Sequence, residues 1–522
     1  MHMEHLRNYH EAQWDEPIVF ALNTPGSRGI LLPDVEADVK SAAGKDMLVP
    51  ESLRRKDKPA LPEISQPQVL RHFLRLSQET VGQDLTADIG LGTCTMKYSP
   101  KINEQFVRSE KFTELHPYQD KETVQGILKL IYDFEQIMKE ISGLDAVSFQ
   151  PGGGGMGIYS NAAVLKKYFE ERGEAEQRTE IITTILSHPL NSAAPATKGF
   201  RVISLYPGEN GYPSVEDLKA AVSEKTAGIF ITNPEDTGVF NPYIKEFIRI
   251  VHEAGGLCIC DMADYNGLFG LVRAKEWGAD MCQFNLHKAF SSPHGCMGPG
   301  CAAQCVSAEL EQFLPRPRVR FDGSKYYLDD SGTHSIGKVR QFQGSLTAVI
   351  RAYSWVMSLG AEGLKTVGET AILNNNYMMK RVLDTVRGIS IPWGESGLNR
   401  LEQVRYSFET LYQETGVDVT DINNRMLDFG YQRSFASHHP MIVAEPYTPE
   451  PTESYSKADI DEYVNTLSHI SKEAYHSPEL LKSSPHNTPI SRLEVDSIAK
   501  PEELAVTWRA YQRICSQQTS RV

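Results

Sequence analysis

The sequence predicts an α/β fold in which a mostly parallel sheet carries helices on both faces. Between residues 146 and 285, short apolar runs alternate with amphipathic stretches of helical period, the pattern of strands joined by crossover helices. The expected strands are 146–150, 180–186, 201–206, 227–232, 256–261 and 280–285. The helices expected between them include 162–172, 215–224 and 244–255.

The regions on either side of this pattern predict two further parts. Residues 1–90 are interrupted by prolines and predict an N-terminal arm, with a helix at 67–80. A long helix at 124–142, ended by Gly143, belongs to a large domain expected over 91–330. Beyond it the sequence is helix-rich with an isolated strand at 439–446, which predicts a smaller α+β C-terminal domain over 331–522.

Length, charge and cysteine usage narrow the class of protein. A chain of 522 residues is too long for one core, so more than one domain is expected. The net charge of −14 argues against nucleic acid or an anionic membrane as the main partner. Of the eight cysteines, Cys301 and Cys305 have metal-like spacing but no second pair, so no metal is expected. With no apolar signal region and no membrane-length run, a reducing cytoplasm is expected.

Lys288 stands three residues after the end of the last expected strand and is followed by serines and glycines. A lysine is costly to bury unless its ammonium is paired, neutralised or covalently used. Asp261 ends the preceding strand, and a glycine loop at 152–155 follows the first strand. The carboxyl ends of parallel strands share one edge of a sheet. A glycine loop before a helix suits a phosphate, an aspartate suits a protonated pyridine nitrogen, and a lysine suits a Schiff base. Together they predict pyridoxal phosphate (PLP).

Each of these features alone also has an ordinary structural explanation. A glycine run is commonly a turn, an aspartate after a strand is commonly a helix cap, and a lysine at a strand end can extend to solvent. Their coincidence at one edge of one sheet favours the cofactor site.

Several segments carry more specific motifs: GLGTCTMKYSPKINE (90–104), LHPYQ (115–119), ETVQG (122–126), SFQPGGGG (148–155), ITNPEDTG (231–238), NLHKAFSSPHGCMGPG (285–300) and EPTES (450–454). Together they resemble the P-protein family of the glycine cleavage system, glycine dehydrogenase (decarboxylating), in its PLP-bearing second-subunit form. The resemblance runs from residue 17 to residue 489. It implies PLP-dependent transferase fold type I and an active site at a subunit interface.

The resemblance also implies an activity, partners and site residues. In the family, glycine binds PLP through an imine and loses CO2, and the aminomethyl group passes to the lipoyl arm of the H-protein; a homologous first subunit is the other partner. Lys288 would carry PLP, Asp261 would hold the pyridinium and His188 would lie beside the ring. The cofactor-binding residues implied are Gly152, Gly153, Gly154, Gly155, Met156, Thr232, Asn233, Asp261, Ala263, His287 and Lys288.

Five positions depart from the family pattern: Met156 replaces a ring-stacking histidine, Leu190 a threonine, Met262 a glycine, Asp264 an asparagine and Gln343 a tyrosine. These departures leave a second interpretation open. A repurposed, homodimeric PLP enzyme would remove a proton from a larger amino acid, then eliminate or replace a β- or γ-substituent, or form a C–C bond.

A third interpretation is a non-catalytic binding subunit, which the retained lysine and aspartate disfavour. For the substrate carboxylate, Arg340 is a candidate, with a plain surface arginine as the alternative.

Overall fold

The computed structural model describes residues 6–43, 49–57, 59, 61–82, 85, 87, 89–92, 94–293, 298–394, 399–492, 507, 509, 512, 513 and 516. Residues 294–297 of the motif at 285–300, as well as Thr93 and Cys515, lie outside this set. The chain divides into two compact units. The first comprises residues 1–7, 83–426 and 431–483, and the second comprises 8–82, 427–430 and 484–522.

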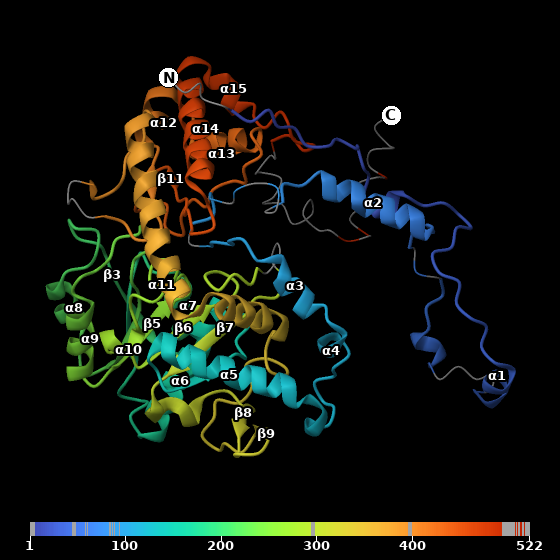
Figure 1. The fold of residues 1–522 in the computed structure, drawn as a ribbon, viewed down its shortest axis with the longest axis horizontal. Helices are drawn as coiled ribbons and strands as arrows, with labels where there is room; N and C mark the ends of the chain where they lie inside the picture. Colours follow the sequence, from blue (N-terminus) through green and yellow to red (C-terminus); the bar gives the residue numbers. More distant parts are fainter. Residues whose placement is uncertain are drawn as a thin grey trace. The chain divides into compact units, whose positions relative to one another are not determined.

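A seven-stranded sheet forms the centre of the first unit (Figure 1), in the order β1-β7-β6-β5-β4-β2-β3. Strands β2 to β6 are parallel, and β7 runs antiparallel to both β1 and β6. Their bounds are β1 Ala146–Ser148, β2 Glu180–Thr184, β3 Arg201–Leu205, β4 Thr226–Thr232, β5 Leu257–Met262, β6 Met281–Asn285 and β7 Ala302–Val306. All six predicted strands are confirmed, whereas β7 was not predicted.

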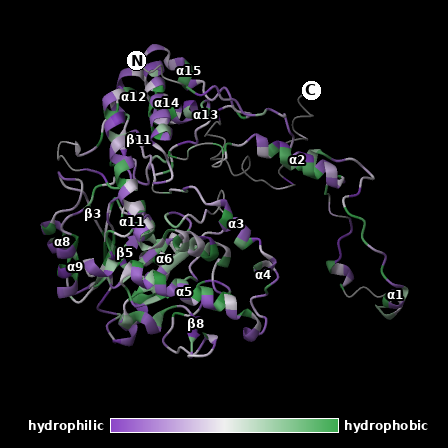
Figure 2. Ribbon diagram, viewed as in Figure 1, coloured by the Kyte–Doolittle hydropathy of each residue, from purple (hydrophilic) through white to green (hydrophobic). Residues whose placement is uncertain are grey.

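Apart from the edge strand β3, the strands of this sheet are buried on both faces, which is why they read as nearly continuous apolar runs. Successive residues alternate between two hydrophobic clusters: Ile181 belongs to one and Ile182 to the other, as do Phe230 and Ile231. Helices cover both clusters, and Figure 2 colours the central strands largely as hydrophobic and much of the outer surface of the helices as hydrophilic. The predicted two-faced α/β architecture is therefore confirmed.

The helices of the large sheet follow the predicted periodicity. The long helix at 124–142 is α5, Gln125–Ser142, and its C-cap Gly143 has φ 73°, a conformation that favours glycine. The helices predicted between strands are α6 Gly154–Glu171, α8 Val215–Ala221 and α9 Ile244–Glu253. Those not predicted are α3 Lys101–Val107, α4 Glu110–Thr113, α7 Leu190–Thr197 and α10 Ala274–Trp277.

Beyond the sheet the chain is mostly helical, as predicted. A hairpin of β8 Arg318–Phe321 and β9 Tyr326–Asp329 precedes α11, Leu346–Thr385, which is interrupted at Gly360. Then follow α12 Glu409–Thr415, α13 Val419–Leu427, α14 Lys457–His476 and α15 Pro478–Lys482, with a two-stranded sheet of β10 Tyr406–Ser407 and β11 Pro446–Tyr447.

The strand predicted at 439–446 is wrong. This run is apolar, but it begins as a turn in which the Ile442 N–H donates to His439 O at 3.0 Å. Pro440 has no N–H to give to a ladder, so pairing starts only at Pro446, opposite Ser407.

The second unit contains α1, Ala37–Ala43, and α2, Gln66–Gln78, which confirms the helix predicted at 67–80. Ser65 is the N-cap of helix α2 and forms a capping box with Gln68. On its buried side, His72 Nδ1 lies 2.8 Å from Glu16 Oε1. Across the described residues of both units, no helix is long and apolar enough to cross a membrane.

We expect Phe134→Ala to destabilise the first unit by about 3–5 kcal/mol, because it leaves a cavity in the core. Phe134 is fully buried and stacks on Phe149 with ring centroids 5.1 Å apart. Urea unfolding measures the loss. Leu373→Ala on α11, where the side chain is 70% exposed, is the matched control and should change stability by about 0.5 kcal/mol or less. Equal effects of the two substitutions would contradict this assignment of the core.

Candidate active site

Polar residues stand at the carboxyl ends of the central strands. Thr232 of β4 pairs with Asp261 of β5, and Asp261 pairs with Gln283 of β6. Lys288 lies one turn beyond β6, with its backbone N–H donating to Asn285 O at 3.1 Å. The parallel register therefore brings these side chains to one edge of the sheet.

The Asp261 carboxylate is buried and held by three donors. Oδ2 accepts from Asn191 Nδ2 at 2.9 Å, and Oδ1 accepts from the Ala263 N–H at 3.1 Å and from the Gln283 amide. Asn191 Nδ2 also lies 3.3 Å from Thr232 Oγ1. The carboxylate is thus fixed in position and orientation, as a partner for a protonated ring nitrogen must be. Ala263, one of the cofactor-binding residues that the family resemblance implies, contributes its backbone N–H. Asn191 and Gln283 were not among the residues predicted from the sequence.

The Lys288 side chain is buried in a field of acidic groups. Burial alone would lower the pKa of its ammonium, but Cys94, Asp264, Asp261 and Glu450 outweigh this and raise the pKa. Lys288 and Asp261 therefore act on each other electrostatically within one site.

Asp264 lies in a buried cluster of acidic side chains that includes Glu450. Asn266 Nδ2 donates at 2.9 Å to both Asp264 Oδ1 and Glu450 Oε1, and Thr95 donates to the other Glu450 oxygen. Burial, together with the charge of Asp264, raises the pKa of Glu450 and of Glu402 well above the usual range. Burial therefore favours the protonated forms of these two groups, which reduces the repulsion between neighbouring acids.

The glycine loop is closely surrounded by side chains. A Cβ would lie 2.4 Å from Arg340 Nη1 at Gly152, 2.8 Å from Asn285 Nδ2 at Gly154 and 2.6 Å from Leu190 Cδ1 at Gly155. A side chain at these positions would force Arg340, Asn285 or Leu190 to shift. Gly153, with φ 149°, a conformation that favours glycine, is the N-cap of the 18-residue helix α6. The loop thus presents backbone amides and a guanidinium, the donors that a phosphate takes.

Met156 and His287 flank the glycine loop. Met156 Sδ accepts from the Gly152 N–H at 3.2 Å, and the side chain stays 36% exposed. His287 Nδ1 lies 3.1 Å from Cys301 O and ties the turn after β6 to the start of β7. Met156 therefore supplies an apolar surface beside the glycine loop. His287 holds the turn after β6 against the start of β7.

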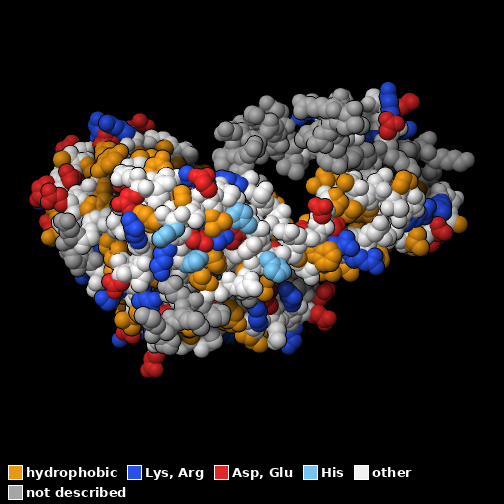
Figure 3. Space-filling view, turned by 90° about the horizontal axis from the view of Figure 1, so that it is seen from above, with side chains coloured by type: hydrophobic (Ala, Val, Ile, Leu, Met, Phe, Trp, Pro, Cys, Tyr) orange, Lys and Arg blue, Asp and Glu red, His pale blue; other side chains and the backbone are white. Residues whose placement is uncertain are grey.

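His188 follows β2 and lies against a histidine from the C-terminal part of the chain. Its ring meets His438 edge-to-face with centroids 4.4 Å apart, and its Nδ1 accepts from the Leu190 N–H at 3.1 Å. Burial, with the charges of His438 and Lys288, lowers the pKa of His188 although Asp261 opposes the shift. The ring is therefore neutral, with its proton on Nε2. On the face seen in Figure 3, several histidine side chains lie among acidic and basic ones.

Asn233 is the last of the cofactor-binding residues that the family resemblance implies, and its side chain closes the loop between residues 233 and 241. Its Oδ1 accepts from the Asn241 N–H at 2.8 Å, and its Nδ2 donates to Asn241 O at 3.2 Å. Met262, one of the departures, packs in the core cluster on the face of β5 opposite to Asp261.

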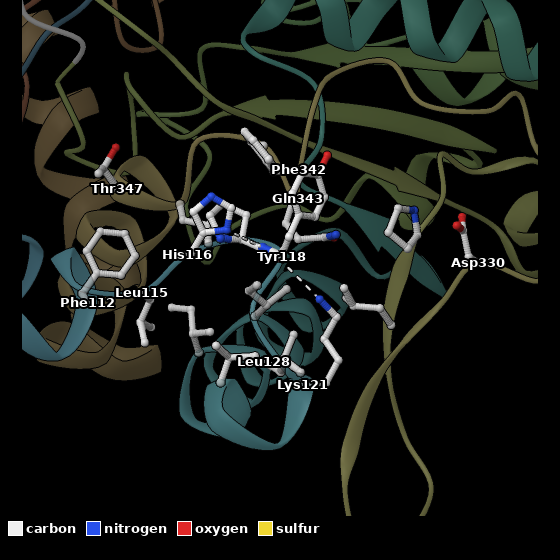
Figure 4. A pocket seen from close by; sticks show the side chains of 18 of the residues that line it. Phe112, Leu115, His116, Tyr118, Lys121, Leu128, Asp330, Phe342, Gln343 and Thr347 are labelled. Atoms are coloured by element: carbon white, nitrogen blue, oxygen red, sulfur yellow. Dashed lines mark hydrogen bonds between the residues drawn. The ribbon is translucent and has the colours of Figure 1, made fainter. Parts of the chain in front are cut away.

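A cavity of about 560 Å³ lies in the same unit (Figure 4). Its lining includes Tyr118 and Phe342, whose ring centroids are 5.2 Å apart, together with His116, Lys121 and Gln343. The segment 115–119 and Gln343, both singled out in the sequence, therefore meet at this cavity.

Family models match two parts of the chain. The aminotransferase class-V model matches residues 153–311, and the model for the C-terminal domain of glycine dehydrogenase matches residues 367–488. Among solved structures, the chain resembles an inhibitor-bound glycine decarboxylase (P-protein) of the glycine cleavage system, with a TM-score of 0.65 and 18% identity, covering 83% of this chain and 94% of that one. A NifS-like protein gives a TM-score of 0.56 at 15% identity, covering 73% and 98% of the two chains.

The fold and the class-V match define the class of protein, a PLP-dependent enzyme of fold type I. The chain is 42% identical to the probable glycine dehydrogenase (decarboxylating) subunit 2 of Pyrococcus horikoshii over 97% of its length and 98% of the relative's. It is 36% identical to the protein of that name from Staphylothermus marinus, over 97% and 99% of the two chains. The chain belongs to the glycine dehydrogenase (decarboxylating) subunit 2 family.

We expect Glu235→Gln to reduce the loss of stability at alkaline pH. Burial raises the pKa of Glu235 to about 8, although Thr184 donates to its Oε2. The folded state thus binds this proton more tightly than the unfolded chain, where the pKa is about 4.3. The resulting stabilisation is complete below pH 4 and is lost as the pH rises towards 8.

Thermal unfolding at pH 5 and pH 8.5 tests this expectation. The melting temperature of the wild-type protein should fall by about 2–4 °C more than that of Glu235→Gln. Exposed Glu224→Gln is the control and should keep the wild-type slope. The same pH dependence in all three proteins would contradict the expectation.

Proposed function

We propose that this chain is the PLP-bearing subunit of a glycine-decarboxylating system, which removes CO2 from glycine and passes the aminomethyl group to a lipoyl carrier protein. Family membership supports the reaction, since the relatives are named for it. The observation that carries the assignment is the Asp261 carboxylate, held by three donors at the sheet edge where Lys288 is buried. A non-catalytic subunit would not need this costly arrangement.

The residues present fit the cofactor. The glycine loop at 152–155 leaves its backbone open to a ligand, and its amides and Arg340 would hold the phosphate. Asp261 would keep the ring nitrogen protonated, and Lys288 Nζ would hold the aldehyde carbon. When bound, PLP supplies an electron sink that accepts the electron pair left at Cα as CO2 departs.

The surrounding side chains would control protons and water. Lys288 Nζ would take the proton of the substrate amine when the substrate displaces it. His188, kept neutral by burial, holds a proton on Nε2 that it can deliver within the site. Asn191 would keep Asp261 facing the ring through its 2.9 Å bond to Oδ2. The apolar surface of Met156 and Leu190 would exclude water around the reacting carbon.

We propose two partners, a homologous first subunit and a lipoyl carrier. The first follows from the subunit naming of the relatives, and the second follows from the chemistry, because the aminomethyl group must reach an acceptor.

A second candidate function is proton removal from a larger amino acid by a homodimer, followed by β- or γ-elimination, replacement or C–C bond formation. Met156 favours it, since this apolar side chain is 36% exposed beside the glycine loop. Exchange of labelled bicarbonate into glycine favours the first function, and product formation from a larger amino acid without that exchange favours the second.

We expect Lys288→Arg to abolish covalent retention of PLP, because arginine keeps the charge but cannot form the bond. Borohydride reduction followed by peptide mass spectrometry should find the cofactor on Lys288 in the wild-type protein only. Cofactor fixed at another lysine would contradict the assignment.

We expect Asp261→Asn to lower bicarbonate exchange by about 10²-fold or more, because the substitution removes the negative charge facing the ring nitrogen. Asp280→Asn is the matched control. Asp280 accepts from the Cys258 N–H at the amino ends of the strands, and asparagine can keep that bond. Equal losses in the two variants would indicate general destabilisation and contradict the role of Asp261.

A further inference from the structure

Three side chains of metal-ligand type lie together at the amino ends of β5 and β6, away from the edge that carries Asp261 and Lys288. They are His252 in the last turn of α9, Cys258 in β5 and Asp280 directly before β6. Their ligand atoms, a ring nitrogen, Sγ and a carboxylate oxygen, all lie within 4.8 Å of one another. In the part of the chain that the structure describes, no other three His, Cys, Asp or Glu side chains gather in this way.

Backbone hydrogen bonds fix Cys258 and Asp280 against each other. The Asp280 N–H donates to Cys258 O at 2.9 Å, and the Cys258 N–H donates to Asp280 Oδ2 at 2.7 Å. This reciprocal pair stands directly before the parallel ladder of β5 and β6, which begins with Ile259 opposite Met281. The thiolate and carboxylate ligands are therefore positioned by the sheet before any ion binds.

His252 brings the third ligand from α9. Its Nε2 lies 2.8 Å from Asp280 Oδ2, and the Gly255 N–H donates to His252 O at 2.8 Å and closes the turn after the helix. The side chain of His252 is 38% exposed and that of Asp280 is 22% exposed, whereas Cys258 is fully buried. One side of the group thus faces solvent, which provides an entry path and room for a water as the fourth ligand.

The ligand types select a divalent cation that binds sulfur. Thiolate, imidazole and carboxylate are all zinc ligands, whereas Mg²⁺ and Ca²⁺ take oxygen ligands. Burial raises the pKa of the Cys258 thiol well above its usual range, and the bond to Asp280 raises the pKa of His252. Both shifts favour the protonated forms, so an ion must displace these protons to solvent, which a thiophilic metal can do.

The metal-free structure also has an ordinary explanation for part of this group. His252 and Asp280 form an ion pair, and the Cys258 thiol donates weakly to Ile248 O, 3.8 Å away. An ion pair between partly exposed side chains contributes little to stability. It does not require a cysteine as its third neighbour, whereas a metal site does.

We propose that His252, Cys258 and Asp280 form a zinc site that joins the end of α9 to the starts of β5 and β6. Zn²⁺ with one thiolate, one carboxylate and a neutral imidazole has no net charge, so a partly buried position suits it. Because a tetrahedral ion keeps nitrogen and oxygen ligands about 3.3 Å apart, the exposed ring of His252 must move slightly away from Asp280.

This site is independent of the proposed reaction, since its residues are not among those assigned to the cofactor. The sequence did not predict it, because the 28 positions from His252 to Asp280 match no metal motif. Only the fold brings the three side chains together.

Zinc content and cobalt spectra test the proposal. The full-length, PLP-loaded protein is freed of metal with a chelator, incubated with zinc chloride and dialysed, and it should retain one zinc ion per chain. Co²⁺ titrated into the metal-free protein should give the visible bands of a tetrahedral thiolate complex, at longer wavelengths than PLP absorbs. Zinc should also raise the melting temperature.

Cys258→Ser and His252→Gln should each weaken Co²⁺ binding by more than about 100-fold, because even the loss of a residue that only supports a ligand costs about 10- to 100-fold. Neither variant should be stabilised by zinc. If Cys258→Ser does not fold, His252→Gln decides the question, because its side chain is partly exposed at a helix end.

Cys260→Ser and His476→Gln are the matched controls. Cys260 is also buried, two positions further along β5, and His476 is an exposed histidine at the end of α14. Both controls should keep the wild-type Kd for Co²⁺. A wild-type protein that retains no zinc would overturn the proposal, and so would Co²⁺ binding that is unchanged in Cys258→Ser or in His252→Gln.

Discussion

The site depends on the register of three parallel strands. Because β4, β5 and β6 pair without offset at their carboxyl ends, Thr232, Asp261 and Gln283 lie side by side, and the amide of Gln283 fixes one oxygen of Asp261. A shift of one residue would turn Asp261 to the opposite face of the sheet. The burial of Lys288 one turn beyond β6 depends on the same register.

Electrostatics then distributes protons among closely packed ionisable groups. Nearby acidic groups raise the pKa of Lys288 and favour its charged form, whereas burial raises the pKa of Glu450 and of Glu402 and favours their protonated forms. His188 is neutral between charges of both signs. One buried region thus brings together Lys288, the imidazole of His188 and the fixed carboxylate of Asp261.

The departures from the family pattern have different structural consequences. Met156 and Leu190 lie at the glycine loop, whereas Met262 packs in the core and Gln343 lines another cavity. Asp264 joins the acidic group beside Lys288. Three of the five positions therefore bear on the site, and they change its polarity without removing Lys288 or Asp261.

The sequence alone determined the strand order along the chain, the two-faced sheet and the edge at which Asp261, Lys288 and the glycine loop gather, because periodicity and strand ends are local properties. It did not indicate β7, Asn191 or Gln283, whose roles come from pairing with residues distant in the chain. The strand expected at 439–446 failed for a related reason: apolar composition alone does not supply a pairing partner. Only the tertiary structure decided which buried polar groups are satisfied, because hydrogen bonds depend on distances that no local pattern encodes.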